Sequence, residues 1–495
     1  MLANLLREDP SLILATDQYE LTMAKAYWKS GMAEREAVFH MFFRSNPFKG
    51  GFVVMAGLET LMSMLESFRF SKGDLDYLST LKDSADNQLF EDEFLAYLDK
   101  LRFNCDLYAM EEGTLAFPNE PLVRVQGPIL QAQLLESILL NTLNFQSLIA
   151  TKAARVCMAA QGEPVVDFGL RRAQGIDGAF SASRASYIGG CVGTSNVLAG
   201  KALGLPVMGT HAHSWVMAFD DEKSAFEAFH EAMPDNCIFL VDTYGTMQGL
   251  QNAIEVGLKM KKAGHHLIGV RLDSGDLAYF SKQARVLLDE AGLEDTKIMG
   301  SSDLDEYLIR SLKSQGAKIN AWGVGTNLVT GKDEPALTGV YKLSSIRNPE
   351  GSDWNHKLKI SETKFKTSIP GILDLLRFRD AKGNIRADAI TDVFEDSQQV
   401  RMIIDPNDHT NRKRLNGGLQ AESLLKPIYL RGVRKYTPPP IEKVRERTLE
   451  QLSQLDESHK RFENPHIYPV GLSIRVNQFR DEMITREKEH LLASG

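Results

Sequence analysis

The feature that most constrains the fold is a regular alternation of short apolar runs and amphipathic segments between residues 164 and 324. The apolar, largely β-branched runs fall at residues 164–168, 206–209, 238–242, 267–272, 297–300 and 319–324. Segments with helical spacing lie between them, at residues 222–233, 247–263, 277–291 and 304–315. Strands joined through helical crossovers run parallel, so this region predicts a parallel sheet covered by helices. With residues 339–345 as a seventh strand, the repeat favours a closed or nearly closed α/β barrel. An open doubly wound sheet is the alternative, and the periodicity of the sequence does not distinguish the two folds.

Each expected strand is followed by a short polar cluster. The clusters read DFGLRR (167–172), GTHAHS (209–214), VDTYGT (241–246), VRLDSGD (270–276), GSSDLDE (300–306) and GVGTN (323–327). In an α/β barrel the carboxyl ends of all strands meet at one mouth, where barrel enzymes keep their active sites. Six clusters at the same relative position therefore predict an enzyme with its site at this mouth.

The remaining chain predicts further domains, because 495 residues exceed what one hydrophobic core supports. Helical spacing at residues 16–28, strand-like runs at 37–43 and 113–125, and a long apolar helix over 129–159 precede the repeat. We expect an N-terminal α/β sandwich-like domain at 1–128, the barrel at 129–346, and a C-terminal region at 347–495 that packs back on the body.

Composition excludes several classes of protein. A net charge of −8 argues against a general nucleic-acid binder. The sequence contains no window of 18 uncharged apolar residues, so we expect no membrane-spanning helix. The charges at Arg7, Glu8 and Asp9 argue against a signal peptide. The four cysteines are scattered without a CxxC pair, which favours neither structural zinc nor disulfides. We expect a cytoplasmic protein with neither nucleic-acid nor membrane partners.

The strand-end residues suit recognition of phosphate and carboxylate groups. Asp242 and Asp273 follow successive strands and could ligate Mg²⁺, although acids there also cap helices. Arg171, Arg172 and Arg271 offer planar guanidinium groups to anions, with surface ion pairs as the alternative. The glycine-rich turns at 300–302 and 323–326 allow backbone N–H groups to approach a phosphate closely.

His211 and His213 admit several interpretations. A strand-end His-x-His opens the metal site of many barrel hydrolases, but such a site needs more histidines at later strand ends. His265 and His266 precede their strand and would lie at the opposite face. A nucleophile or proton carrier is the other chemical role, and for His211 a structural role is favoured.

Taken together, these motifs resemble the nicotinate phosphoribosyltransferase family of type II phosphoribosyltransferases. The resemblance covers most of residues 10–345, in order, and fades in the tail. It rests on TDQYELTM, ESILLNTLNFQSLIATKAARV, DFGLRRAQG, GTSNVLAG, HSWV, VDTYGT, VRLDSGD, GVGTNLV and GVYKL. It implies an irregular TIM-like α/β barrel and an ATP-dependent enzyme (EC class 6.3.4). Such an enzyme forms nicotinate mononucleotide and pyrophosphate from nicotinate and phosphoribosyl pyrophosphate, in NAD biosynthesis.

The resemblance also implies roles for individual residues. His213 resembles the histidine that ATP phosphorylates. Asp242 and Asp273 resemble the other catalytic residues, and Mg²⁺ is the implied cofactor. Phe168 and Arg171 resemble base-pocket residues, and Tyr19 would close the pocket from a partner subunit, which implies a homodimer with shared active sites. The remaining implied substrate contacts are Ser195, Ser214, Arg271, Gly300, Ser301, Gly323, Gly325 and Thr326.

Ser195 bears on substrate choice. The related nicotinamide enzymes carry an Asp at this position, where a carboxylate would accept an amide N–H and repel nicotinate. Serine therefore favours nicotinate. Two alternatives stay open: a metal-dependent barrel hydrolase that uses His211 and His213, and a catalytically silent nucleotide-binding relative.

Overall fold

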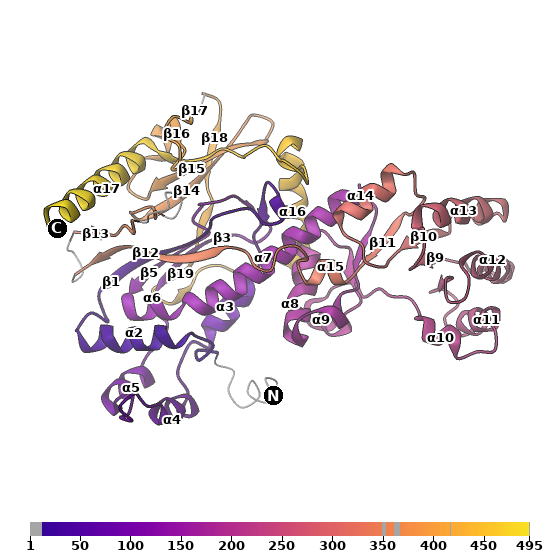
Figure 1. Ribbon diagram of the computed structural model, residues 1–495, viewed down its shortest axis with the longest axis horizontal. Coiled ribbons are helices and arrows are strands. Elements are labelled where there is room, and N and C mark those ends of the chain that lie inside the picture. The colour runs from indigo at the N-terminus through magenta and orange to yellow at the C-terminus, as the bar shows by residue number, and fades with distance from the viewer. Residues whose placement is uncertain (1–11, 349–352, 361–366, 416, 495) are drawn as a thin grey trace. The chain divides into compact units, whose positions relative to one another are not determined.

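The structure is a computed structural model that describes residues 12–348, 353–360, 367–415 and 417–494 (Figure 1). The chain forms two compact units: residues 1–147 with 336–495, and residues 148–335. The first eleven residues, on which the expectation about a signal peptide rests, lie outside the described residues. Within the described part no helix is long and apolar enough to cross a membrane.

The first unit is built on an antiparallel sheet that draws strands from both ends of the chain. Its order in the described residues is β13-β12-β1-β5-β3-β19-β20. The strands are β1 (Glu36–Phe43), β3 (Asp106–Met110), β5 (Val123–Pro128), β12 (Gly339–Arg347), β13 (Asn355–His356), β19 (Leu425–Leu430) and β20 (Val433–Arg434). The strands β2 (Val53–Val54) and β4 (Leu115–Ala116) form a separate antiparallel pair. The N-terminal strands β1, β5 and β3 therefore form the centre of the sheet, and strands from later in the chain flank them on both sides.

The helices of the first unit follow the apolar spacing of the sequence. They are α2 (Gln18–Lys29), α3 (Leu58–Glu66), α4 (Lys72–Thr80), α5 (Asp92–Asp99), α6 (Ile129–Leu134), α16 (Ile441–Gln454) and α17 (Ile474–Ser494). The long helix expected over 129–159 is interrupted at Leu135, and its second part is α7 (Glu136–Ala159), which contains the boundary between the units.

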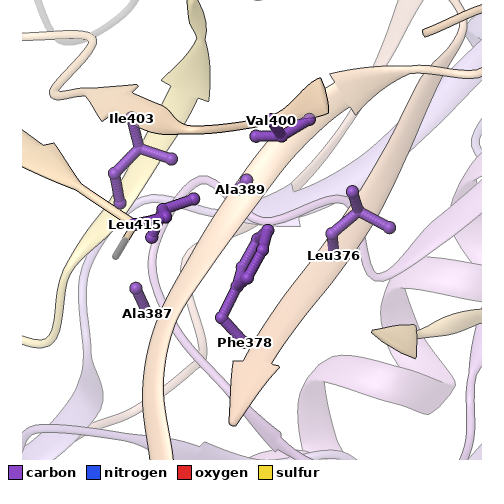
Figure 2. Packing of buried hydrophobic residues seen from close by; sticks show 7 residues of the cluster. All are labelled: Leu376, Phe378, Ala387, Ala389, Val400, Ile403 and Leu415. Atoms are coloured by element: carbon purple, nitrogen blue, oxygen red, sulfur yellow. The ribbon is translucent and has the colours of Figure 1, made fainter. Parts of the chain in front are cut away.

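A second, mixed sheet in the first unit carries buried side chains on both faces of its inner strands. Its order is β17-β16-β21-β15-β14-β18, with β14 (Leu373–Arg379), β15 (Ile385–Asp392), β16 (Met402–Ile404), β17 (Arg412–Arg414), β18 (Gln420–Ser423) and β21 (Val470–Ser473). On one face an apolar cluster forms, from Leu376, Phe378, Ala387, Ala389, Val400, Ile403 and Leu415 (Figure 2). Side chains alternate along a strand, so Arg377 and Asp388, which pair across β14 and β15, point to the other face, where both are fully buried.

Two buried side chains of the first sheet hold the start of β14. The Leu373 amide donates to His40 Nε2 at 3.1 Å, and Arg124 Nη1 donates to the Leu373 carbonyl at 2.7 Å. His40 and Arg124 are themselves directly opposed on β1 and β5. Burial, together with the charge of Arg124, lowers the pKa of His40 to about 3. His40 is therefore neutral in the folded protein.

We expect His40 to make stability depend on pH. The unfolded chain protonates this histidine near pH 6.5 and the folded chain only near pH 3, so below pH 6.5 the unfolded state binds more protons. Between pH 6.5 and 5 this difference removes about 2 kcal/mol from the free energy of unfolding. His40→Gln keeps an acceptor for the Leu373 amide but does not titrate. Urea titrations at both pH values should show the smaller acid loss in the variant, and an equal loss in both proteins would contradict the prediction.

The second unit is a parallel sheet with helices between its strands, as expected. The strands are β6 (Val165–Asp167), β7 (Gly193–Thr194), β8 (Ile238–Leu240), β9 (Gly269–Leu272), β10 (Lys297–Gly300) and β11 (Ala321–Val324). They are arranged in the order β7-β6-β11-β10-β9-β8, and every pairing is parallel. Its helices are α8 (Gly175–Ile188), α9 (Val197–Leu203), α10 (His213–Met217), α11 (Glu222–Ala232), α12 (Thr246–Lys262), α13 (Leu277–Glu290), α14 (Glu306–Ser314) and α15 (Thr326–Val329) (Figure 1).

Two of the strands expected from the sequence need correction. The strand at residues 339–345 is β12 of the antiparallel sheet, because its partner is β1 and not a barrel strand. Residues 206–209 contribute only an isolated bridge between Val207 and Thr194. A closed barrel is not confirmed, since no ladder in the described residues joins this segment to β8. The domain limits expected at 128 and 346 also differ from the observed units, because the C-terminal strands complete the N-terminal sheet.

Candidate functional site

The carboxyl ends of the parallel strands surround a cavity of about 360 Å³, entirely within the second unit. The cavity is lined by Phe168, Arg171, Arg172, Ser195, Gly209, Thr210, His211, Ala212, Arg271, Asp273, Ser301, Ser302, Asp303, Gly323, Gly325 and Thr326. All six polar clusters except the one after β8 contribute to this lining. The structure thus brings together nine of the residues proposed from the sequence as catalytic or substrate-binding: Phe168, Arg171, Ser195, Arg271, Asp273, Ser301, Gly323, Gly325 and Thr326.

Arg271 is the centre of the hydrogen-bond network in this cavity. Its guanidinium group donates to Ser301 Oγ at 2.8 Å, Thr210 Oγ1 at 3.0 Å and Asp273 Oδ1 at 2.6 Å. Ser301 also donates to Asp273 Oδ1. Burial acts to raise the pKa of Asp273, but the Ser301 hydrogen bond and the Arg271 charge outweigh it, and the pKa lies below its usual value. Asp273 is therefore a fixed carboxylate.

Phe168 forms an aromatic wall, and Gly323 makes room for it. A Cβ on Gly323 would lie 2.5 Å from the Phe168 ring, and the Arg271 guanidinium carbon lies 5.4 Å from the ring centroid. Close approach of the Phe168 ring is therefore one reason for glycine at 323, and the phosphate contact predicted there stays a prediction. Gly325 precedes α15, whose first N–H groups have no acceptor within the helix.

Arg171 and Arg172 follow β6 in a short 3-10 turn, and both side chains are exposed. Neither guanidinium group has an ion-pair partner in the part of the chain that the structure describes. The surface ion pairs weighed as an alternative are therefore not observed. Two unpaired cations at the rim of a cavity suit an anionic ligand.

His213 begins α10 and lies next to the cavity without lining it. Its Nδ1 is 3.1 Å from Thr243 Oγ1, and its Nε2 is 4.0 Å from Asp273 Oδ2. Its side chain is 40% exposed. When Nδ1 donates its proton to Thr243, Nε2 holds a lone pair that an incoming group can reach.

His211 is buried, and its ring lies among Phe226, Phe229 and Phe239. The Leu240 amide donates to its Nε2 at 3.2 Å, so this nitrogen is already used as an acceptor. Burial lowers the pKa of His211 to about 4. A metal ion shared with His213 would have to displace the Leu240 amide. The described residues also contain no group of three or more His, Cys, Asp or Glu side chains arranged to hold a metal.

The acids at the strand ends divide into two kinds. Asp276 caps α13 by accepting the Tyr279 amide at 2.9 Å, the structural role considered for such acids. Asp242 instead accepts the Asp273 amide at 2.9 Å and the Ser274 hydroxyl at 2.6 Å through Oδ2. Its Oδ1 is buried and has no hydrogen-bond partner. Asp242 therefore supports Asp273 from outside the cavity lining.

Three other proposed residues lie outside the lining. Gly300 ends β10, where a Cβ would lie 2.9 Å from Ile319, and Ser214 is exposed on α10. Tyr19 belongs to the first unit, on α2, and its side chain is 45% exposed. Burial, followed by the charge of Glu136 and a hydrogen bond to it, raises the pKa of Tyr19 above its usual value.

Sequence reasoning missed Asp167 as a residue that shapes the site. This fully buried carboxylate accepts the Gly169 amide at 2.8 Å, the Thr194 hydroxyl at 2.7 Å and the Ser183 hydroxyl at 3.0 Å. It thereby joins the turn after Phe168 to the turn that carries Ser195. A lone acid at the end of an apolar strand, two residues before a glycine, is the signal that could have identified it.

Models of one protein family match most of this chain. The model described as the nicotinate phosphoribosyltransferase N-terminal domain matches residues 14–144. The model of the nicotinate phosphoribosyltransferase family matches residues 164–349, and the model of its C-terminal domain matches residues 374–480. The three matches are consecutive and cover most of the sequence.

Individual relatives are similar over nearly their full length. The chain is 43% identical to a nicotinate phosphoribosyltransferase of Bacillus subtilis (strain 168), with 94% of each chain covered. It is 36% identical to that of Dictyostelium discoideum, with 93% of this chain and 86% of the relative covered. The crystal structure of human nicotinic acid phosphoribosyltransferase superposes with a TM-score of 0.82 at 31% identity, covering 94% of this chain and 99% of that one. The chain belongs to the nicotinate phosphoribosyltransferase family.

Proposed function

We propose that this chain transfers a phosphoribosyl group from phosphoribosyl pyrophosphate to nicotinate, releasing pyrophosphate, as a step in NAD biosynthesis. The observation that most supports the proposal is the strand-end cavity, where Phe168 provides an aromatic wall and Arg171 and Arg172 provide unpaired cations. These groups suit a flat pyridine ring with a carboxylate and a substrate with several phosphates. We further propose that the second unit is an irregular TIM-like barrel.

The chemistry needs positioning more than proton transfer. The bond between ribose C1 and the pyrophosphate oxygen breaks, and a bond from C1 to the pyridine nitrogen forms. That nitrogen has no proton to lose, so no general base is required. The developing charge on the leaving pyrophosphate is stabilised by cations fixed in advance, which is the task proposed for the arginines of the cavity. Asp273, held ionised by Arg271 and Ser301, would orient the ribose hydroxyls or the positive ribosyl centre.

ATP coupling through His213 is part of the proposal. In that step Nε2 attacks the γ-phosphorus of ATP, a P–N bond forms, and ADP leaves. The contact between Nδ1 and Thr243 supports this role, because it leaves Nε2 as the nucleophilic nitrogen. The phosphohistidine would then bias the mouth towards a state that binds substrates tightly, before water releases the phosphate.

Mg²⁺ would enter with the phosphates of the substrate. One oxygen of each of Asp242 and Asp273 is already used in hydrogen bonds, so the two acids do not form a resident metal cage. Mg²⁺ commonly keeps several waters and takes one or two carboxylates plus substrate phosphates. Asp273 Oδ2 is the oxygen that fits such a contact, and the ion would neutralise pyrophosphate charge.

A cytoplasmic homodimer with shared active sites completes the proposal. The partly exposed ring of Tyr19, anchored through its hydroxyl by Glu136, supports a role in covering a partner's base pocket.

The test is product formation from nicotinate and phosphoribosyl pyrophosphate with Mg²⁺, with and without ATP. Nicotinate mononucleotide and pyrophosphate that increase with ATP are the expected products. Nicotinamide in place of nicotinate is the control. If nicotinamide is used at comparable efficiency, the proposed specificity is wrong, and no product under any condition would overturn the proposed reaction.

We expect Ser195→Asp to exchange the substrate preference. Ser195 lines the cavity close to the segment that carries Phe168, so an aspartate there would place a second carboxylate beside that of nicotinate. Like-charge contacts of this kind cost several kcal/mol, so kcat/KM for nicotinate should fall about 100-fold or more while nicotinamide becomes a better substrate. Ser195→Ala, which adds no charge, is the matched control. Steady-state kinetics with both bases measures the effect, and a similar loss in both variants would contradict it.

A further inference from the structure

The parallel sheet of the second unit has the strand order of a barrel with one open seam. The chain passes through β6, β7, the segment 206–210, β8, β9, β10 and β11, and β11 pairs back with β6. Each neighbour in this ring is linked by a ladder or a bridge, except for the segment 206–210 and β8. At this seam β8 presents backbone groups that have no strand partner among the described residues.

His211 fills this gap with its side chain. The Leu240 amide points to the seam, because the neighbouring Val241 amide donates to Arg271 of β9 on the opposite side of β8. His211 Nε2 accepts the Leu240 amide at 3.2 Å, and the ring centroid lies 5.1 Å from that of Phe229 and 6.2 Å from that of Phe239. The imidazole therefore occupies the position that a backbone carbonyl of a seventh strand would take.

The local chemistry keeps the imidazole in the form that this contact requires. Accepting an N–H requires an unprotonated Nε2, so the single proton sits on Nδ1, which is 3.4 Å from the Ala212 carbonyl. Burial among three phenylalanine rings, with the charges of Arg271 and His213 nearby, lowers the pKa of His211. The neutral Nδ1–H tautomer is the resulting state near pH 7.

Fixing His211 also fixes residues that face the cavity. Thr210, one residue earlier, accepts Arg271 Nη1 at 3.0 Å. Ala212, one residue later, is the N-cap of α10, and His213 is its first residue. His213 in turn contacts Thr243, which lies three residues after Leu240. The segment 210–213 and the end of β8 are thus linked at two points, His211 to Leu240 and His213 to Thr243.

We propose that His211 is a positioning residue: its Nε2 replaces the missing strand pairing at Leu240 and so sets the register between His213 and Thr243. This role differs from catalysis, since the ring reaches the site only through its neighbours. The expected effect of His211 on ATP coupling rests on the proposed function. Its expected effect on the backbone of β8 at the seam does not.

The test compares two substitutions in the full-length protein. His211→Gln keeps an acceptor near the position of Nε2, and His211→Phe keeps a ring among Phe226, Phe229 and Phe239 but has no acceptor. Hydrogen exchange of the peptide that contains Leu240 should be about tenfold faster in the Phe variant and close to wild type in the Gln variant. His230→Phe on α11 is the control for a generic His→Phe change.

Kinetics then connect the seam to His213. The Phe variant should lose most ATP stimulation of kcat, and the Gln variant should retain it. Unchanged exchange at Leu240 in the Phe variant, or equal impairment of both variants, would overturn the proposal. If the wild type shows no ATP stimulation at all, the proposed coupling fails, and the exchange data still decide the role of His211.

One measurement on the wild type keeps the proposal testable if His211→Phe does not fold. In a ¹⁵N-histidine spectrum at pH 7, the His211 resonance, identified by its absence from the spectrum of His211→Gln, should show Nδ1 protonated and Nε2 unprotonated. A protonated Nε2 would contradict the proposal.

Discussion

Replacing His213 by alanine should abolish ATP stimulation and leave a slow, ATP-independent transfer. Among the described residues, His213 is the only histidine beside the cavity whose Nε2 is not used in a hydrogen bond. Its Nδ1 contacts Thr243, and its Nε2 is 4.0 Å from Asp273. Arg271, Asp273 and Phe168 do not depend on it, so substrates should still bind and react. Loss of a group that takes part directly in a chemical step costs on the order of 10²–10⁴-fold in rate.

The measurement is initial velocity with and without ATP, together with transfer of label from γ-labelled ATP to the protein. Wild type should carry acid-labile label and the His213→Ala variant none. His211→Ala should lose less, because His211 acts through its neighbours. Equal loss of ATP stimulation in both variants, or persistent labelling of His213→Ala, would refute the assignment of the phosphorylated residue.

Replacing Arg377 by methionine should destabilise the first unit by about 3–5 kcal/mol, the usual cost of removing one partner from a buried ion pair. Arg377 binds Asp388 at 2.6 Å, and both side chains are fully buried. It also donates to Gln451 Oε1 at 3.0 Å and to the Leu115 carbonyl at 2.8 Å. The variant would leave the Asp388 carboxylate without a cation, although the Tyr468 hydroxyl, 2.9 Å away, would still donate to it.

The surroundings of Asp388 do not readily accommodate its unpaired negative charge. Burial and the nearby Asp388 already raise the pKa of Glu120 well above its usual value, so this buried site disfavours carboxylate charge. Urea unfolding at pH 7 measures the loss. Arg386→Met on β15 is the matched control, because its pair with Asp380 lies at the surface and its removal should leave the urea midpoint unchanged. A combined Arg377→Met and Asp388→Leu variant should recover part of the loss, and an unchanged midpoint for Arg377→Met alone would contradict the prediction.

The sequence predicted the second unit well, because each strand end carries its own polar signal. Arg271 and Asp273 lie at the end of β9 and Phe168 at the end of β6, and parallel pairing brings the carboxyl ends of all these strands to the same edge of the sheet. The glycine at 323 was recognised as a place of close approach, but sequence could not show that the approaching group is the Phe168 ring.

The first unit was less predictable for a physical reason. A β-strand pattern shows that one face is buried but does not identify the partner strand. Residues 339–345 have a strand pattern that fits either sheet, and only the pairing with β1 decides. Likewise Asp167 and the contact between His211 and Leu240 depend on side chains meeting backbone groups from distant segments, for which no local pattern exists.

The interleaved first unit has a consequence for synthesis on the ribosome. Asp106 of β3 receives a hydrogen bond from the Arg431 amide, 325 residues later, and β19 pairs with β3 along most of its length. At about 5–20 residues per second, the N-terminal strands wait tens of seconds for these partners. The second unit, contiguous from 148 to 335, is complete before then and can fold while the edge of β3 still lacks its partner strand. We therefore expect nascent chains that stop before β19 to need chaperone protection for the N-terminal segment. A stop codon near the end of the chain should then be more damaging than the small number of lost residues suggests.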